Sequence, residues 1–266
     1  ALNLMQYATQ QRQRAEQTAA QLAASEKSVR LRAEWAQGLQ KAGEELSACN
    51  TIEDVARVAA QTPVAHLGAR RAWVSTPREG GRMAPLASSS PDFQCDAETY
   101  ECVRVVHGSG QKLIVPDTLS QAPSDTCRQA AETGHFRSCG TWPIRAGGQC
   151  VATLTIQCPE AGADSRVVAA EVLIEVFCRQ VGYVWERLAR EDTLRRLTRA
   201  IEQSPVSVVI TDPKGAIEYV NPYFTRATGY TFEEARGQNP RILNSRQQPP
   251  EFYQEMWSVL AAGKEW

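Results

Sequence analysis

The sequence predicts an α+β protein in which two domains are joined by one long helix, and three features support this. Residues 164–203 carry apolar side chains at helical spacing and contain no proline. Two glycine-rich turns, Glu79-Gly80-Gly81 and Gly147-Gly148, separate runs typical of antiparallel strands. Residues 206–220 form a further strand-turn-strand pattern. We therefore expect an antiparallel sheet with flanking helices, a long connecting coiled-coil helix, and a smaller second sheet.

The composition is that of a chain that folds around hydrophobic cores. Its 266 residues are 42% apolar and 22% charged, which leaves room for two ordinary domains. A net charge of -1 provides no basic excess, so we expect no nucleic-acid partner. No window reaches the ~18 apolar residues of a membrane span, and the N-terminus lacks the order of a signal peptide. We expect a cytoplasmic protein, and a piece of a longer one because the chain starts at Ala1 and stops at Trp266 without a tail.

The long helix is expected to measure roughly 60 Å, at ~1.5 Å per residue. Its apolar residues keep a heptad spacing at first and resume out of register after residue 190, as a stutter produces. This stripe predicts a parallel homodimer and a signal-relaying helix. The residues expected to form it are Phe177, Val181, Val184, Leu188 and Leu194. The alternative is two ordinary helices broken near Arg190-Glu191.

Residues 1–36 are expected to form a helix with a weak seam. Half of the core positions in its heptad pattern are alanine, and two are the charged Arg12 and Glu26. The apolar positions are Met5, Ala8, Ala15, Ala19, Leu22, Val29, Ala33 and Ala36. Because alanine buries little area, this helix should pair with a copy of itself only with help from neighbouring domains.

Turn and cap signals divide residues 37–165 into helices and strands. Thr51 stands two residues before Glu53-Asp54, as an N-cap does, and Gly134 is placed to stop a helix. Every second residue from Cys150 to Cys158 is apolar, so one face of that strand must contact a core. The expected helices are residues 46–60 and 125–133, with a further helix of undefined bounds, and the expected strands are residues 69–76, 83–88, 112–116, 139–145 and 150–158.

The remaining residues predict the start of a second domain. Proline and glycine in Asp212-Pro213-Lys214-Gly215 stand where a type I turn places them. Asn221 is expected to cap a short helix that begins at Pro222. The expected strands are residues 206–211 and 216–220, and a last helix is expected at residues 251–262, ended by Gly263.

Four segments of the first domain occur in the order and spacing of a known family: Leu113-Ile114-Val115-Pro116-Asp117, Gly134-His135-Phe136-Arg137-Ser138, Trp142-Pro143-Ile144 and Gly148-Gln149-Cys150-Val151-Ala152-Thr153-Leu154. Residues 34–190 thereby resemble a GAF domain. The resemblance implies an antiparallel sheet with the terminal helices on one face and a cap over a ligand pocket on the other. It also implies that the helices around Leu46 and Val172 form the dimer-side pair.

The second domain resembles a PAS domain. The resemblance lies in its strand-turn-strand-Asn-Pro run, followed by Thr228-Gly229-Tyr230 and Gly237-Gln238-Asn239-Pro240-Arg241-Ile242-Leu243. A PAS fold has five strands, so three more would follow Trp266, and we expect this half to be the less stable one. The predicted domains are an N-terminal helix (1–36), the GAF domain (37–190), a linker helix (191–203) and an incomplete PAS domain (204–266).

No catalytic or metal-binding pattern is present in the sequence. There is no Gly-x-Ser-x-Gly, no phosphate-binding Gly-x-x-x-x-Gly-Lys-Ser/Thr and no Cys-x-x-Cys among the eight cysteines. His135 and Cys139 are two possible ligands, and two do not make a metal site. We expect most cysteines to be small, buried or half-buried thiols. The fragment is therefore not expected to be an enzyme.

Five residues are candidates for ligand binding, and the resemblances suggest how. They are Cys127 and Trp142 in the GAF half, and Asn239, Arg241 and Trp257 in the PAS half. Bilin-binding GAF domains usually follow their cysteine with histidine, where this chain has Arg128, so Cys127 is favoured as a surface-helix cysteine. Flavin photochemistry of the LOV type needs a cysteine after Asn239, where this chain has Pro240. A noncovalent ligand in either pocket stays open, and the sequence does not identify the cofactor.

These resemblances predict the sensory and dimerisation region of a bacterial signalling protein. Its output domain, a histidine kinase or a diguanylate cyclase, would lie beyond the C-terminus. Two alternatives are a ligand-free dimerisation scaffold and a bilin- or flavin-binding photosensor or redox sensor.

Overall fold

The computed structural model describes residues 2–90, 101–162, 165–245 and 247–266. They fold as two units, Ala1–Arg190 and Glu191–Trp266, and the α+β class is confirmed. Within the described residues, no helix combines the length and apolarity needed to cross a membrane.

The first unit is built on a five-stranded antiparallel sheet in the order β2-β1-β5-β4-β3. Its strands are β1 (Arg71–Pro77), β2 (Met83–Ser88), β3 (Leu113–Val115), β4 (Ser138–Ala146) and β5 (Gln149–Cys158). The two predicted hairpins are confirmed, β1 with β2 and β4 with β5. Gly147 and Gly148 both have positive φ, as the turn between β4 and β5 requires.

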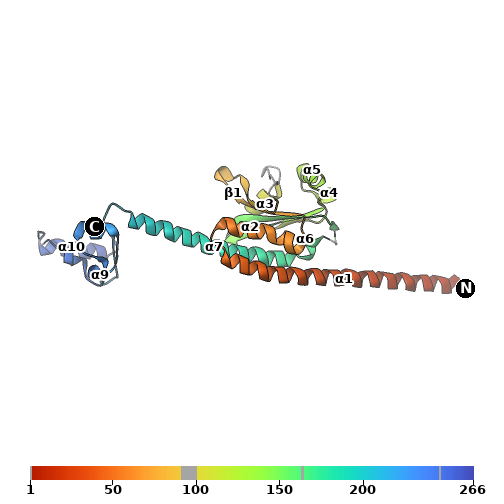
Figure 1. Cartoon of the computed structure of the whole chain (residues 1–266), viewed down its shortest axis with the longest axis horizontal. Coiled ribbons are helices and arrows are strands. Elements are labelled where there is room, and N and C mark those ends of the chain that lie inside the picture. The colour runs from red at the N-terminus through yellow and green to blue at the C-terminus, as the bar shows by residue number, and fades with distance from the viewer. Residues whose placement is uncertain (1, 91–100, 163–164, 246) are drawn as a thin grey trace. The chain divides into compact units, whose positions relative to one another are not determined.

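Helices cover both faces of this sheet (Figure 1). One layer consists of α1 (Leu2–Ala48), α2 (Ile52–Thr62), a π-helical turn (Pro63–Leu67), α6 (Arg166–Ala169) and α7 (Glu171–Glu202). The other layer, here called the cap, consists of α3 (Glu101–Ser109), α4 (Thr118–Gln121) and α5 (Asp125–Gly134). The left-handed residue that ends α5 is His135, with a φ of 51°, and not Gly134, which is still helical.

The N-terminal helix is longer than the sequence patterns indicated. It continues from residue 36 to Ala48, because Trp35 and Leu39 on its later turns are buried in the core of the unit. A single helix over residues 46–60 is therefore wrong. Thr51 does cap the helix that follows, since its side chain accepts a hydrogen bond from the Asp54 N–H at 3.1 Å.

Helix α7 is continuous through Arg190-Glu191, which excludes the two-helix alternative. It begins at Glu171, seven residues later than expected, because Ala170 leaves the helical region with φ −103° and ψ 9°. Residues 163–164 of the predicted helix lie outside the described residues.

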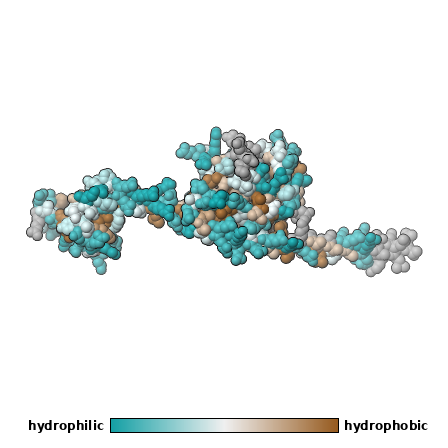
Figure 2. Space-filling view, in the orientation of Figure 1, coloured by the Kyte–Doolittle hydropathy of each residue, from teal (hydrophilic) through white to brown (hydrophobic). Residues whose placement is uncertain are grey.

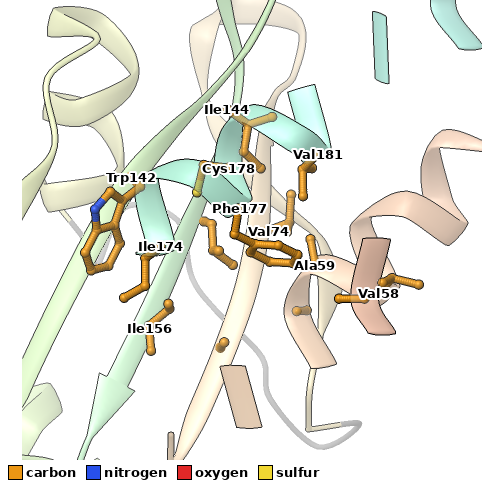
Figure 3. Packing of buried hydrophobic residues seen from close by; sticks show 14 of the residues in the cluster. Val58, Ala59, Val74, Trp142, Ile144, Ile156, Ile174, Phe177, Cys178 and Val181 are labelled. Atoms are coloured by element: carbon orange, nitrogen blue, oxygen red, sulfur yellow. The ribbon is translucent and has the colours of Figure 1, made fainter. Parts of the chain in front are cut away.

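The first part of α7 packs into its own unit. Phe177 and Val181 have 0% exposed surface, Leu188 has 7%, and Val184 is half-buried. Figure 3 shows the Phe177 ring pointing between Val74 and Ala59, and Trp35 of α1 meets the same ring edge-on at 6.1 Å. The predicted dimer seam is therefore corrected at Phe177, Val181 and Leu188, which face the core of the unit. Half-buried Val184 and exposed Leu194 are not enclosed in that core.

The later part of α7 is exposed to solvent. From Asp192 to Ala200 every residue is exposed, and Leu194 keeps 64% of its surface. Figure 2 shows mostly hydrophilic atoms along this segment. An i,i+4 ion pair at 2.8 Å joins Arg196 to Asp192 on its surface.

The second unit contains a two-stranded antiparallel sheet of β6 (Val209–Thr211) and β7 (Ile217–Val220). Four helical segments follow: α8 (Pro222–Thr228), α9 (Phe232–Ala235), a 3-10 turn (Pro240–Leu243) and α10 (Pro250–Ala261). The predicted turn is confirmed by the Gly215 N–H, which donates to the Asp212 carbonyl at 3.0 Å. The first strand is shorter than expected.

Asn221 holds the second unit to the end of α7. Its Oδ1 accepts hydrogen bonds from the N–H groups of Val208 and Phe224, both at 3.0 Å. Its amide donates to the carbonyls of Ile201 at 3.0 Å and Val206 at 2.9 Å. The predicted cap is thus confirmed, and this one buried side chain also joins α7 to the first residues of the small domain.

Candidate functional site

A row of buried polar side chains lies on the cap-facing side of the five-stranded sheet. Strand register places Ser75 opposite Thr153, and Thr155 opposite both Trp73 and Thr141. Gln157 continues the same face of β5, and all of these polar residues are buried. The alternate residues of β5 point to the opposite face and fill the core under α1, α2 and α7, so both faces of this strand are covered.

Three members of this row have polar atoms without partners. Thr141 and Thr155 share a hydrogen bond of 3.1 Å. Ser75 Oγ, Thr153 Oγ1 and Gln157 Oε1, in contrast, find no hydrogen-bond partner in the part of the chain that the structure describes. Each such buried group costs about 1–3 kcal/mol. A small polar molecule between sheet and cap would supply the missing partners, which makes this row a candidate ligand-binding surface.

Sequence reasoning missed these residues. Thr153, Thr155 and Gln157 alternate with apolar residues in the sequence. This pattern is equally typical of a sheet face exposed to solvent and of a buried polar face. Burial of the polar side depends on the cap helices, which come from a separate stretch of the chain.

Cys127 lies in the first turn of α5, one of the cap helices. It is buried, which corrects the expectation of a surface-helix cysteine. A hydrogen bond with the Cys102 thiol, supported by the Ser124 hydroxyl and the Cys102 backbone N–H, lowers the pKa of Cys127 to about 6. Burial acts in the opposite direction on Cys139 and raises the pKa of that thiol to about 12.

Trp142 lies on the other face of the sheet from Cys127. Its indole packs in the core that α7 covers, beside Ile174 and Ile156 (Figure 3). It also lines a pocket of about 430 Å³ beside Lys112, Arg145 and Glu175. The two predicted residues of this unit therefore do not share one pocket.

In the second unit the three predicted residues do come together. Asn239, Arg241 and Trp257 line one pocket of about 980 Å³, with Tyr253 and Met256 on the α10 side. Asn239 Oδ1 accepts hydrogen bonds from the Arg241 backbone N–H at 3.1 Å and from Arg241 Nε at 3.0 Å. This side-chain contact orients the guanidinium, so the pocket lining includes a positive charge as well as the aromatic side chains of Tyr253 and Trp257.

The turn between β6 and β7 approaches this pocket closely because it has glycine at position 215. Gly215 has a φ of +84°, and a Cβ there would lie 2.7 Å from Asn239 Nδ2 and 3.5 Å from the Trp257 ring. A larger residue would press on the Asn239 amide, would touch the Trp257 ring at ordinary contact distance, and would be strained at this positive φ.

The cysteines offer no metal site among the residues described. No group of three or more His, Cys, Asp or Glu side chains converges there. Of the seven cysteines in the described ranges, six are buried and Cys150 is half-buried, as expected of small thiols. Cys95 lies outside those ranges.

Comparison with known families matches both units. The GAF domain family matches residues 51–185, and the PAS fold family matches residues 195–266.

Known proteins match over shorter stretches or at low identity. The nitrogen fixation regulatory proteins of Klebsiella pneumoniae and Klebsiella oxytoca are each 46% identical over 66 residues, which are 25% of this chain. The matched segment spans 13% of the length of those relatives. A solved nlh2 GAF domain from A. aeolicus, in an inactive state, has 15% identity and a TM-score of 0.49, covering 59% of this chain and 98% of that one.

Proposed function

The chain belongs to the GAF family and continues into a PAS domain, and from this premise we propose that it is the sensory region of a cytoplasmic signalling protein. In this proposal a small ligand binds in one of the two domains. The bound state is relayed along α7 to an output domain, a histidine kinase or a diguanylate cyclase. The relatives named as regulatory proteins support a regulatory role.

The continuity of α7 is the observation that carries this proposal. Its first turns are built into the GAF core through Ile174, Phe177 and Val181. Its last turn is held by the Asn221 amide through the Ile201 carbonyl, at 3.0 Å. A change in either domain therefore acts on one end of a single continuous helix, and such a physical connection can couple two sites.

The PAS pocket brings the three predicted residues together, and its side chains suit a flavin nucleotide. Trp257 provides an aromatic surface for stacking, and Arg241 provides a cation for a phosphate. The volume of about 980 Å³ lies at the upper end of the range for small-molecule pockets. Because Pro240 follows Asn239 in place of a cysteine, binding would be noncovalent.

Titration of the 266-residue chain with FAD, followed by quenching of flavin fluorescence, tests this ligand. We expect saturable binding that Arg241→Ala and Trp257→Ala each weaken by about 10-fold, the effect of ~1.4 kcal/mol. Arg226→Ala is the matched control, because Arg226 stacks on Tyr223 and lies outside the pocket. Equal binding by all four proteins would contradict the assignment.

Hydrogen exchange tests the relay separately. FAD should alter exchange in residues 171–190 of the wild-type chain but not in Leu194→Pro, because proline breaks a helix interior. Leu194→Ala keeps the helix and should respond like the wild type. A response in the proline variant would show that α7 is not the connection.

The proposal includes a homodimer, formed through exposed apolar residues of α7 and not through the buried residues Phe177, Val181 and Leu188. Val172, Tyr183, Leu194 and Leu197 are exposed, and with half-buried Val176 they recur on one side of α7 at 3-4 spacing. The resemblance already assigned the dimer side to this helix and α1. A second copy of the chain would cover these side chains, each worth ~1.5–3 kcal/mol when fully buried.

Sedimentation measures this association. Leu194→Glu with Leu197→Glu should weaken a dimer by at least about 10-fold, whereas Arg199→Glu, on the other side of the same exposed segment, should not. An unchanged dimer in the double variant would exclude this stripe. If the dimer forms and neither FAD nor another small molecule binds, the ligand-free scaffold becomes the better description.

A further inference from the structure

A pocket of about 430 Å³ lies where the edge of the five-stranded sheet meets α7. Strand β3 pairs with β4 only as far as Thr141, so the rest of β4 has no strand on that side. Residues 110–112, which lead into β3, line the pocket there, and α7 contributes Glu175, Cys178 and Arg179. None of the lining residues comes from the cap helices, so this pocket is separate from the buried polar row.

Polar contacts hold the loop at residues 110–112 against both of its neighbours. Arg145 Nη2 of β4 donates to the Gly110 carbonyl at 2.8 Å. A Cβ on Gly110 would lie 2.6 Å from the same nitrogen, so a side chain there would displace the guanidinium. On the other side, Lys112 Nζ meets the carboxylates of Glu171 and Glu175 in α7 at 2.5 Å and 2.8 Å. The loop is therefore fastened to β4 and to the first turns of α7.

Two donor groups of the pocket lining find no acceptor in the part of the chain that the structure describes. One is the guanidinium of Arg179, which is exposed and has no ion pair there. The other is the indole N–H of Trp142, a side chain with 0% exposed surface. Because a buried N–H is rarely left without an acceptor, the pocket is a place where a ligand oxygen could supply one.

The charges of the lining favour an anion that carries a single charge. Arg145 donates to backbone carbonyls, so its positive charge, like that of Arg179, is not offset by a carboxylate partner. Lys112, in contrast, is already paired with α7. Glu175 belongs to the lining and would repel a second negative charge. The Trp142 ring adds an apolar surface, so a carboxylate with a small apolar body matches the pocket best.

We propose that this pocket binds a small organic monocarboxylate. The carboxylate pairs with Arg179 and accepts a hydrogen bond from the Trp142 indole, and the apolar body lies against Pro143. A volume of about 430 Å³ is near the lower end of the range for small-molecule pockets, as a small ligand requires. This goes beyond the proposed function, because it needs no flavin and no ligand in the PAS domain. A molecule bound here contacts α7 directly.

NMR titration of the full 266-residue chain with benzoate tests the proposal, because benzoate joins one carboxylate to a flat apolar ring. A chain labelled with ¹⁵N at tryptophan gives six indole signals, and the one lost in Trp142→Phe belongs to Trp142. We expect benzoate to shift this signal until it saturates. Benzamide, a neutral molecule of the same shape, and phenyl phosphate, a dianion, should each bind at least about 10-fold more weakly. Line broadening of benzoate itself reports binding independently of that variant.

A pair of arginine variants on α7 locates the carboxylate. Arg179→Ala should weaken benzoate binding by at least about 10-fold. Arg199→Ala is the matched control, since Arg199 is exposed later on the same helix and lies outside the pocket. It should bind benzoate like the wild type.

Three results would each overturn the proposal, provided that circular dichroism shows every variant folded. They are no binding of benzoate, binding of benzamide or phenyl phosphate as tight as that of benzoate, and equal binding of benzoate by Arg179→Ala and the wild type. Titration with FAD is a separate measurement on the other domain. Failure of one proposal therefore leaves the other standing.

Discussion

The sheets of the GAF and PAS domains contain similar β-branched runs in very different surroundings. In β5 of the GAF domain, every residue from Ala152 to Cys158 is buried, because the layer with α1 and α7 covers one face and the cap helices cover the other. In β6 of the PAS domain, Val209 is half-buried and Ile210 has 45% of its surface exposed. Coverage by other elements, and not residue type, therefore decides how much each strand contributes to stability.

Helix α7 shows the same contrast within one element. Between Ile174 and Leu188 one side of the helix is held in a core, whereas between residues 192 and 200 every residue is exposed to solvent. The same helix is thus part of the GAF core over its first turns and is exposed to solvent over residues 192–200. The following predictions test how different the two regions are.

Phe177→Ala should produce the largest effect. The side chain is completely buried, and its loss should lower the free energy of unfolding of the GAF domain by about 3–5 kcal/mol. Urea denaturation measures it, with Gln180→Ala, exposed on the same part of the helix, as the control expected to change stability little. A folded GAF domain of normal stability that had become monomeric would restore the dimer-seam interpretation of this residue.

Hydrogen exchange should separate the two sheets directly. We expect the amides of Leu154 and Ile156 to exchange at least about 100-fold more slowly than those of Val208 and Val209, a difference of ~2.8 kcal/mol in opening free energy. Equal protection in a monomer would show that the two-stranded sheet needs no further coverage.

Asn221→Ala should destabilise the PAS domain by about 1–3 kcal/mol, because it leaves two backbone N–H groups without their acceptor. Asn221→Asp keeps both accepted bonds but loses the donors to Ile201 and Val206, so its effect should be smaller. Thermal unfolding of the second domain measures both. Equal stability of the alanine variant and the wild type would contradict the role of this side chain as a joint.

The smallest expected effect is an acid sensitivity at the capping box of α9. The Thr231 backbone N–H, then its hydroxyl, lower the pKa of Glu234 below its usual value of 4.5. A lowered folded pKa means that the stabilisation is complete above pH 4.5 and is lost as the pH falls through the folded pKa. Glu234→Gln should remove this part of the pH dependence. An identical acid profile in the variant would show that the cap contributes nothing measurable.

Local sequence signals determined the elements and their order. Thr51 and Asn221 act as caps because a side-chain oxygen beside a helix start satisfies its first N–H groups wherever the chain lies. The Gly147-Gly148 turn and the alternation in β5 are equally local. Asn239, Arg241 and Trp257 were also identifiable, since they fall within and after one recognisable motif.

Tertiary structure decided which surface each side chain meets. A heptad stripe such as Phe177, Val181 and Leu188 fits a partner helix or its own domain equally well, because the spacing records a buried side and not what buries it. The buried polar row and the burial of Cys127 depend on segments far apart in the chain that fold over one sheet. Trp142 faces away from Cys127 for a similar reason: strand alternation sets opposite faces, but only packing decides which face lies under the cap.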